Sequence, residues 1–420
     1  QIDASGDLIL GGKMIIVGNW GGSKADGQVV GSKAGHVCLN IKDDICADTY
    51  KTSDFYILAP GNSVYSSASG DGYLTLGGSS MAAPQVTGAI GILHQMWPHM
   101  KGDNLVKLVL NTADTNINGY DVNIHGQGLL DLDEATQPQG ALGVPTTGRV
   151  DGTTTSINNT YFATGNISAF SSLSSTNIMI VDEFNRDYYL NLGSTFTAKD
   201  NRKFSNIELM SSNNYIYLPI NQSYGTFAQG GQYNLINNYS FGIYTDENGR
   251  GDYSVNLGRN FNLQDNLNLK TKIGQISEKD TWLGNQSDGV LAVGHNNNTN
   301  FGSIGIEYKI KNNLIRLNYM QGFSNINTSK KSIIKNFSDV NLKSYSVSYE
   351  LYKDAYTTLG WSLSVPSHIT SGKMDLEVGH SVNLDGTINF KNINSDLAQS
   401  TVEKNFGFYY TKKLMNNLGS

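Results

Sequence analysis

The chain is poor in basic charge, in proline and in long apolar runs. Its 30 Lys and Arg stand against 36 Asp and Glu, for a net charge of −6, which leaves no electrostatic footprint for nucleic acid. No run of eighteen apolar residues occurs, so no transmembrane helix is expected. Only seven prolines occur in 420 residues, and the second half is rich in Asn, Ser, Gly and Tyr. This bias suits strands joined by polar turns.

Cysteine is also scarce. Cys38 and Cys46 are the two in the chain. A disulfide closing this short loop is feasible, would stabilise the fold by about 2–3 kcal/mol, and would indicate an exported protein. Two reduced thiols in a cytosolic protein are the alternative. No second Cys or His pair stands at ligand spacing, so we predict no metal site and no cofactor. We interpret the acidic residues Asp43 and Asp44 as solvated charge rather than calcium ligands.

The length allows two or three domains, each able to bury a core. The chain begins with Gln1, without an initiator methionine or a signal peptide that has a charged start and an apolar core. It stops in a turn-like sequence after a strand. From these features we expect a fragment of a longer protein, cut at both ends.

The most informative stretch is Gly-Ser-Ser-Met-Ala-Ala-Pro at residues 78–84. An extended run at residues 72–76 leads through a Gly-Gly turn into an apolar segment, residues 85–97, that reads as a buried helix. Ser80 would then lie at the mouth of the helix, with its hydroxyl exposed and its N–H where an oxyanion would develop. Pro84 is expected in the first turn, where N–H groups lack helical partners. Taken alone, such a serine is usually only an N-cap.

The longer segment around Ser80 distinguishes a catalytic serine from a simple helix N-cap. Gly-x-Ser-Met-Ala-Ala-Pro-x-Val-x-Gly, residues 78–88, closely resembles the nucleophile motif of the subtilisin-like serine proteases, or subtilases. Ser79 stands where threonine is commoner in the family, and Gln85 where histidine is. The resemblance implies that Ser80 is the catalytic nucleophile.

The resemblance covers about the first 140 residues. Residues 13–18 look like a core strand of the family, residues 57–61 like the strand and turn before the serine, and residues 126–135 like the end of the catalytic domain. Between them, residues 103–111 read as a helix capped by Asp103. The resemblance implies that residues 1–140 are the C-terminal half of a subtilase domain, an α/β fold with helices on a parallel sheet.

The partners of the serine are not evident. A serine hydroxyl needs a base, and the base needs an orienting carboxylate. Subtilases supply them in the order Asp, His, Ser, so both should precede Ser80. His36, the sole histidine before it, lacks a His-Gly-Thr setting, and neither Asp3 nor Asp7 matches the family's aspartate strand. Asn19 follows a segment that aligns with a later strand of the family, so we do not assign it as the oxyanion-hole asparagine. We expect the triad partners and the oxyanion asparagine upstream of this chain.

The composition changes after residue 137. Gly, Pro and Thr break the helical patterns, and Ser, Thr and Asn dominate up to residue 175, so residues 141–190 are interpreted as a linker and junction. The element Asp-x-Phe-x-Arg-Asp-aromatic at residues 182–188 resembles the junction after the catalytic domain in bacterial subtilases with an autotransporter-like β-domain. Arg186 is expected to pair with Asp182 or Asp187.

Residues 191–420 show repeated period-2 alternation. Apolar side chains alternate with polar or small ones over residues 303–310, 344–351 and 405–410, and turn signals occur at 247–249, 311–313 and 385–386. This pattern predicts an all-β antiparallel domain, truncated at its C-terminus. An outer-membrane barrel is favoured over a soluble sandwich or open barrel.

The resemblance therefore implies a serine endopeptidase that cleaves protein or peptide substrates through an acyl-enzyme. It would work outside the cytoplasm, secreted or at the cell surface or outer membrane, where the β-domain would insert. The chain as given, lacking the base, is expected to be inactive. A non-catalytic surface adhesin or pseudoprotease is the alternative. An α/β-hydrolase-type esterase, with Asp114 or Asp131 and His125 after the serine, is disfavoured because that motif needs glycine where Ala82 stands.

Overall fold

The computed structural model describes residues 13–22, 25, 29–30, 41–42, 45–46, 52–158, 160–164, 173, 175–198, 229–245, 251–283, 285–352, 357–398 and 402–412. Several predictions made above lie outside these residues: the disulfide between Cys38 and Cys46, the roles of Asp3, Asp7, His36, Asp43 and Asp44, and the turn at 247–249.

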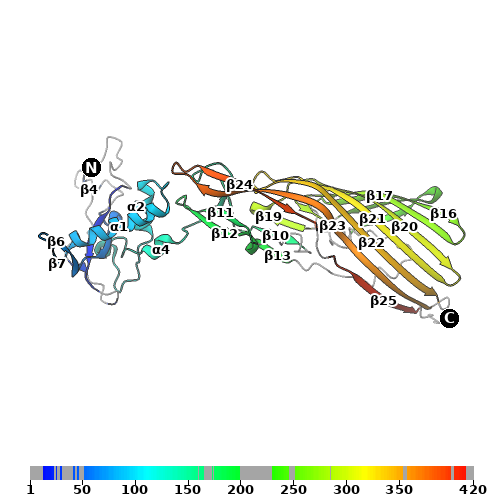
Figure 1. The fold of residues 1–420 in the computed structure, drawn as a ribbon, viewed down its shortest axis with the longest axis horizontal. Helices are drawn as coiled ribbons and strands as arrows, with labels where there is room; N and C mark the ends of the chain where they lie inside the picture. The colour runs from blue at the N-terminus through cyan, green and yellow to red at the C-terminus, as the bar shows by residue number, and fades with distance from the viewer. Residues whose placement is uncertain are drawn as a thin grey trace.

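An α/β unit forms the N-terminal end of the molecule (Figure 1). Its strands are β1 (Ile16–Trp20), β2 (Val29–Val30), β3 (Ile41–Lys42), β4 (Ile45–Cys46), β5 (Tyr56–Pro60), β6 (Val64–Ala68) and β7 (Gly72–Leu76). Its helices are η1 (Thr52–Phe55), α1 (Ser79–Met96), α2 (Gly102–Asn111), α3 (Val122–His125) and α4 (Leu132–Thr136). β1 runs parallel to β5 and pairs antiparallel with β2. The strands expected at residues 57–61 and 72–76 and the helix at 103–111 are confirmed, and the strand expected at 13–18 is present but shifted to residues 16–20. The N-cap of α2 is Lys101, not Asp103.

Helix α1 buries one side only. Its buried residues follow a helical stripe: Ala82, Val86, Ala89 and Leu93. Three of them share a core with Ile57 and Ala59 of β5 and with the buried side of α2. On the other side, Ile92 is 47% and Met96 50% exposed. The expectation of a fully buried helix is therefore wrong, because apolar composition alone does not show which neighbours cover each side.

Two small sheets follow the α/β unit. The first has the order β12-β11-β8-β9 and the second β13-β10-β19-β18. Their bounds are β8 (Gly143–Pro145), β9 (Thr154–Ser156), β10 (Tyr161–Thr164), β11 (Asn177–Val181), β12 (Asp187–Asn191), β13 (Phe196–Ala198), β18 (Thr281–Trp282) and β19 (Asn285–Asp288). Short 3-10 turns η3 (Leu192–Thr195) and η6 (Gly289–Leu291) accompany them. Val144 and Ile178 share a core with Trp282 and with Leu342 of the large sheet.

A ten-stranded antiparallel sheet forms the far end of the molecule (Figure 1). Its strands are β14 (Gln229–Asn234), β15 (Tyr239–Thr245), β16 (Tyr253–Gln264), β17 (Leu267–Glu278), β20 (Asn297–Ile310), β21 (Asn313–Asn325), β22 (Ile334–Tyr352), β23 (Thr357–Val382), β24 (Ile388–Asp396) and β25 (Asn405–Lys412), with η5 (Ile236–Asn238) between β14 and β15. They pair in chain order up to β24, and β25 pairs with the first part of β23.

The sequence-based expectation of antiparallel strands is confirmed. So are the turns at residues 311–312 and 385–386, which join β20 to β21 and β23 to β24. Among the described strands, no pairing joins β14 to β25, so closure of the sheet into a barrel is not observed. None of the helices in the described part of the chain is both long and apolar enough to cross a membrane.

Arg186 joins the α/β unit to the strands that follow. Its side chain is fully buried and donates from Nε and Nη2 to Asp182 Oδ2, at 2.9 and 2.7 Å. It also donates to the carbonyls of Ala135 and Gln137 at the end of α4. The guanidinium lies 4.7 Å from the centre of the Trp97 ring. The expected pairing with Asp182 is confirmed, and the one side chain connects three segments of the chain.

We predict that Arg186→Ala lowers the free energy of unfolding by about 3–5 kcal/mol, because it leaves the buried Asp182 carboxylate without its partner. Arg149→Ala is the matched control, since Arg149 pairs with Asp151 on the surface, where both side chains are well exposed. Urea unfolding of the two variants measures the difference. Equal midpoints for both variants and the parent protein would show that the Arg186 contacts do not hold the junction.

Candidate functional site

The site predicted from the sequence is built on a contact between two glycines. Gly61 follows the last residue of β5, and its carbonyl accepts a hydrogen bond from the N–H of Gly78 at 2.8 Å. Gly78 is the N-cap residue of α1, with φ of 145°, a value that favours glycine. Its own carbonyl accepts from the N–H groups of Met81 and Ala82 at 2.9 and 3.2 Å. The start of α1 is thereby held at the carboxyl ends of the parallel strands β1 and β5.

Ser80 is the second residue of α1 and is exposed. The first N–H groups of a helix have no partners within it, so the N–H of Ser80 is free to act as a donor towards a ligand. Among the described residues, none is hydrogen-bonded to its hydroxyl. Ligand sites of α/β proteins lie at the carboxyl ends of the strands. The position is chemically suited to a nucleophile, and the role of Ser80 stays a prediction.

Pro84 lies deeper in the helix than expected. Because α1 begins at Ser79, Pro84 is its sixth residue and not part of the first turn. It therefore lacks the N–H that would bond to the Ser80 carbonyl four residues earlier. The reason given above for tolerating this proline is wrong, and the Ser80 carbonyl loses its usual helical donor.

The floor under this turn is closely packed around Gly61. A Cβ on Gly61 would lie 2.6 Å from the Gly78 carbonyl oxygen, 2.7 Å from Asn19 Oδ1 and 2.9 Å from Ala82 Cβ. Asn19 is 3% exposed, and its Oδ1 has no hydrogen-bond partner in the described part of the chain. No role was predicted for Asn19 from the sequence. Asn19 lies near the carboxyl end of β1 and pairs with Ala59 of β5, and this position brings it beneath the turn that precedes Ser80.

The described histidines of the α/β unit do not supply a base. His94 lies fourteen residues beyond Ser80 on the same helix, about 21 Å along its axis. His99 bonds through Nε2 to the carbonyl of Asn185 at 2.9 Å. His125 is buried, with Nδ1 3.0 Å from the N–H of Asp121. The esterase alternative is weakened further because Asp131 caps α4. No group of three His, Cys, Asp or Glu side chains suited to a metal ion occurs among the described residues.

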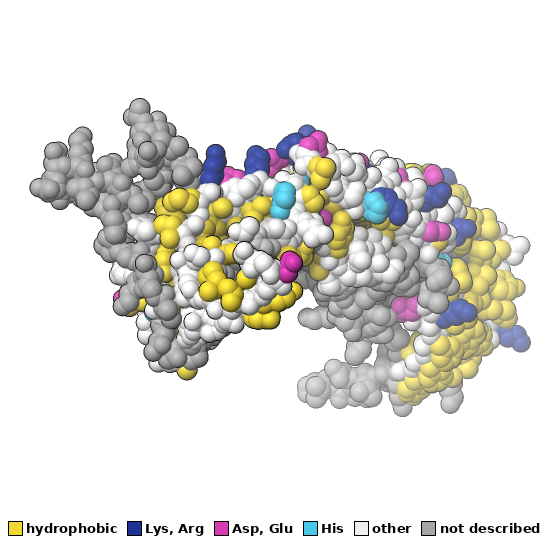
Figure 2. Space-filling model, turned by 60° about the vertical axis from the view of Figure 1, so that its left-hand side comes forward, with side chains coloured by type: hydrophobic (Ala, Val, Ile, Leu, Met, Phe, Trp, Pro, Cys, Tyr) yellow, Lys and Arg dark blue, Asp and Glu magenta, His cyan; other side chains and the backbone are white. Residues whose placement is uncertain are grey.

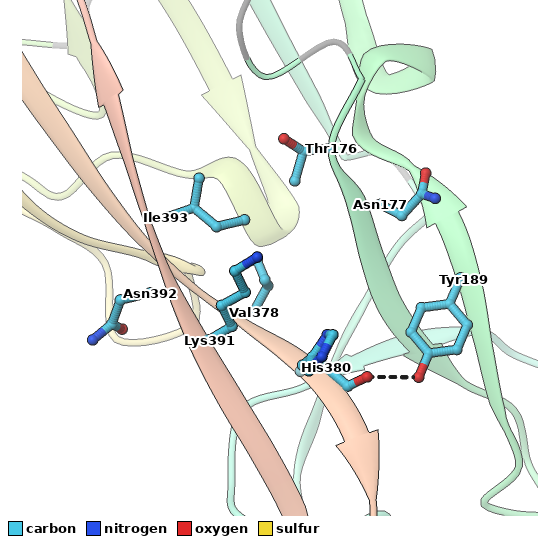
Figure 3. A pocket seen from close by; sticks show the side chains of 9 residues that line it. Thr176, Asn177, Tyr189, Val378, His380, Lys391, Asn392 and Ile393 are labelled. Atoms are coloured by element: carbon cyan, nitrogen blue, oxygen red, sulfur yellow. Dashed lines mark hydrogen bonds between the residues drawn. The ribbon is translucent and has the colours of Figure 1, made fainter.

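A separate cleft of about 570 Å³ lies between the hairpin β11–β12 and strands β23 and β24. Figure 3 shows Tyr189 and His380 facing each other across it, where the Tyr189 hydroxyl donates to the His380 carbonyl at 2.9 Å. Burial, and then the nearby Asp187 carboxylate, raise the pKa of Tyr189. None of its lining residues comes from the turn that precedes Ser80, so this cleft is not part of the Ser80 site.

Comparison with known proteins bears on the α/β unit. Residues 14–140 match the subtilase family. Fervidolysin from Fervidobacterium pennivorans is 45% identical over 75 residues, 18% of this chain and 10% of that protein. Subtilisin DY from Bacillus licheniformis is 33% identical over 85 residues, which are 20% of this chain and 30% of that protein. An extracellular serine protease from Serratia marcescens is 30% identical over 120 residues, and the match covers 23% of this chain and 11% of that protein.

These matches support a subtilase. They cover less than a third of the length of each of the three relatives. The family match ends at residue 140, before the first strand of the small sheets. The α/β unit is therefore similar to part of a serine protease.

We predict that Gly61→Ala lowers the free energy of unfolding by about 1–3 kcal/mol, because the added methyl group would overlap the Gly78 carbonyl. Gly88→Ala is the control: Gly88 lies on the exposed side of α1, and a Cβ there meets nothing within 4 Å. That variant should gain about 0.5–1 kcal/mol from helix propensity. Thermal unfolding distinguishes the two, and a stabilised Gly61→Ala variant would contradict the packing described here.

Proposed function

We propose that this chain is part of an exported serine endopeptidase of the subtilase type, with residues 1–140 as the C-terminal half of its catalytic domain and Ser80 as its nucleophile. The observation that carries the proposal is the exposed Ser80 at the start of α1, within the segment that matches the subtilase family. The Ser80 Oγ would attack the carbonyl carbon of a peptide bond and form an acyl-enzyme. Its backbone N–H would supply one donor of the oxyanion hole.

The histidine and aspartate that activate Ser80 would come from a segment before this chain. The exposed apolar side of α1 supports this, since Ile92 and Met96 there are about half exposed. Gly88 and Gly91 lie on the same exposed side with open space where a Cβ would stand, so another element could approach the helix closely. With the upstream segment absent, the chain by itself would lack peptidase activity.

We predict that Ser80→Ala in the full-length protein lowers turnover of a peptide substrate by about a million-fold, the loss seen when subtilisin loses its catalytic serine. Thr87→Ala, on the exposed part of the same helix, should leave turnover unchanged. Steady-state assays of both variants provide the test. Full activity of Ser80→Ala would remove the nucleophile assignment, whereas an inactive parent protein would favour the pseudoprotease alternative.

The large sheet has one apolar face, and we propose that it inserts into the outer membrane as a closed barrel. The apolar face carries exposed side chains at alternate positions of adjacent strands: Phe241, Leu257, Ile273, Ile304, Ile306, Leu317, Tyr319, Tyr345, Trp361, Leu363, Phe406 and Phe408. Ile306 stands opposite Leu317, and Leu363 opposite Phe406. Figure 2 shows hydrophobic side chains gathered over the receding part of the molecule. So large an exposed apolar surface needs a partner.

The opposite face is polar. Lys270 of β17 pairs with Glu307 of β20 at 2.7 Å, and Glu307 also accepts from Arg316 of β21 at 3.2 Å. Arg316 pairs in turn with Glu350 of β22, which accepts from the Tyr409 hydroxyl of β25. A soluble sandwich would bury the apolar face and expose the polar one. The reverse arrangement supports a sheet that faces lipid and encloses a polar interior.

Leu317→Arg should destabilise the chain folded in lipid vesicles by about 2–4 kcal/mol, because it places a charge on the lipid-facing surface. Asn312→Arg puts the same charge in the turn between β20 and β21 and should have little effect. Urea titration of vesicle-embedded protein measures both. Equal stability of the two variants would argue that the apolar face does not contact lipid.

A further inference from the structure

The polar face of the large sheet holds three buried residues with polar atoms that lack partners. Lys272 of β17 is 4% exposed, and Asn256 and Ser254 of β16 are 2% and 0% exposed. Lys272 Nζ, Ser254 Oγ and both amide atoms of Asn256 have no hydrogen-bond partner in the described part of the chain. Buried polar groups are nearly always hydrogen-bonded, and buried charges are nearly always paired. Lys272 pairs with Gly258, two residues from Asn256 on the adjacent strand, so these two near neighbours indicate a ligand that satisfies both. Ser254 lies four residues from Gly258, about 13 Å along β16.

Two glycines form a floor beneath these side chains. Gly258 stands between Ser240 of β15 and Lys272 of β17 in the register of the sheet. A Cβ on Gly258 would lie 2.7 Å from Ser240 Oγ and 3.9 Å from Lys272 Cε, so both side chains extend over this glycine.

The second glycine lies two residue pairs further along the same strands. Gly242 stands opposite Asn256, and a Cβ on it would lie 2.5 Å from Asn256 Nδ2. Lys272 thus reaches towards β16, and Asn256 towards β15. The Lys272 side chain therefore lies over Gly258, and the Asn256 amide lies over Gly242.

The carboxylates near this level of the polar face are already engaged. Glu307 accepts from Lys270 and Arg316, and the Oε1 of Glu350 accepts from Arg316. Asp252 and Glu278 lie six residues along the strands from the level of Lys272, about 20 Å away. Lys272 is therefore held apart from water without a protein anion beside it, and burial, followed by the nearby Lys270 charge, lowers its pKa to about 7. An external anion bound beside it would favour its charged form.

We propose that Lys272 and Asn256 form a binding site for a small oxyanion, a carboxylate or a phosphate. The Lys272 ammonium would neutralise its charge, and the Asn256 amide would donate hydrogen bonds to its oxygens. The site does not involve Ser80, and the proposal of an anion site does not depend on the proposed peptidase activity.

Isothermal titration of the folded full chain with inorganic phosphate, and separately with acetate, tests the proposal. We expect saturable binding of at least one of them, and the stronger of the two identifies phosphate or carboxylate as the preferred chemistry. Lys272→Met should weaken it by about tenfold or more, because the charge-assisted contact is lost. Lys270→Met is the matched control: it removes the same charge from the same face and strand, but from a residue already paired with Glu307. The Lys270→Met variant should therefore lose much less affinity than Lys272→Met.

Two further variants protect the test against misfolding. Lys272→Arg keeps the charge and should bind better than Lys272→Met. Asn256→Ala should weaken binding while it leaves every ionised group in place. The proposal is overturned if neither anion binds the parent protein, if Lys272→Met binds as tightly as the parent, or if Lys270→Met loses as much affinity as Lys272→Met.

Discussion

The hydrogen bond between the Gly78 N–H and the Gly61 carbonyl is the contact on which the candidate active site depends. It ties the turn before α1 to the end of β5, and it leaves no room for a side chain at Gly61. Gly78 also adopts a backbone conformation that favours glycine. Because both positions are fixed, the first turn of α1 has one place relative to the parallel strands. The exposure of Ser80 follows from that placement.

The rest of the molecule depends on two other constraints. The Arg186 side chain contacts the end of α4, the Trp97 ring and the turn between β11 and β12, so it links the α/β unit to the antiparallel region. Beyond it, the period of two along each strand sorts side chains onto two faces. One face is apolar and exposed. The other carries an ion-pair chain from Lys270 to Glu350 and, beside it, the unpaired Lys272. The opposed chemistry of these faces is the physical basis for the proposed membrane location.

Local sequence patterns predicted the elements well. The motif at residues 78–88 located the serine at a helix start, and alternation located β20, β22 and β25, because both signals depend on neighbouring residues in the chain. Features that depend on distant segments were harder to predict. The pairing of β8 with β11 joins residues far apart in sequence, so a stretch interpreted as a linker and junction also contributes strands and core residues.

In the candidate sites, too, features set by neighbouring residues were predicted and features set by distant segments were not. Ser80 was found from its motif, but the position of Pro84 within the helix, the exposed side of α1 and the approach of Asn19 to the turn all needed three-dimensional neighbours. Lys272 carries no signal in the sequence, since a lysine on an alternating strand is usually solvated. Only its burial above Gly258, away from every engaged carboxylate, distinguishes it from Lys270.

The central claim is that Ser80 is an activated nucleophile in the whole protein. Treatment of the full-length protein with a fluorophosphonate, followed by peptide mass spectrometry, tests it most directly, since only a serine activated by a base reacts quickly with such a reagent. The account predicts a phosphonyl adduct on Ser80. A proteolytically active protein that is inhibited by the reagent, with the adduct on another residue and Ser80 unmodified, would contradict it.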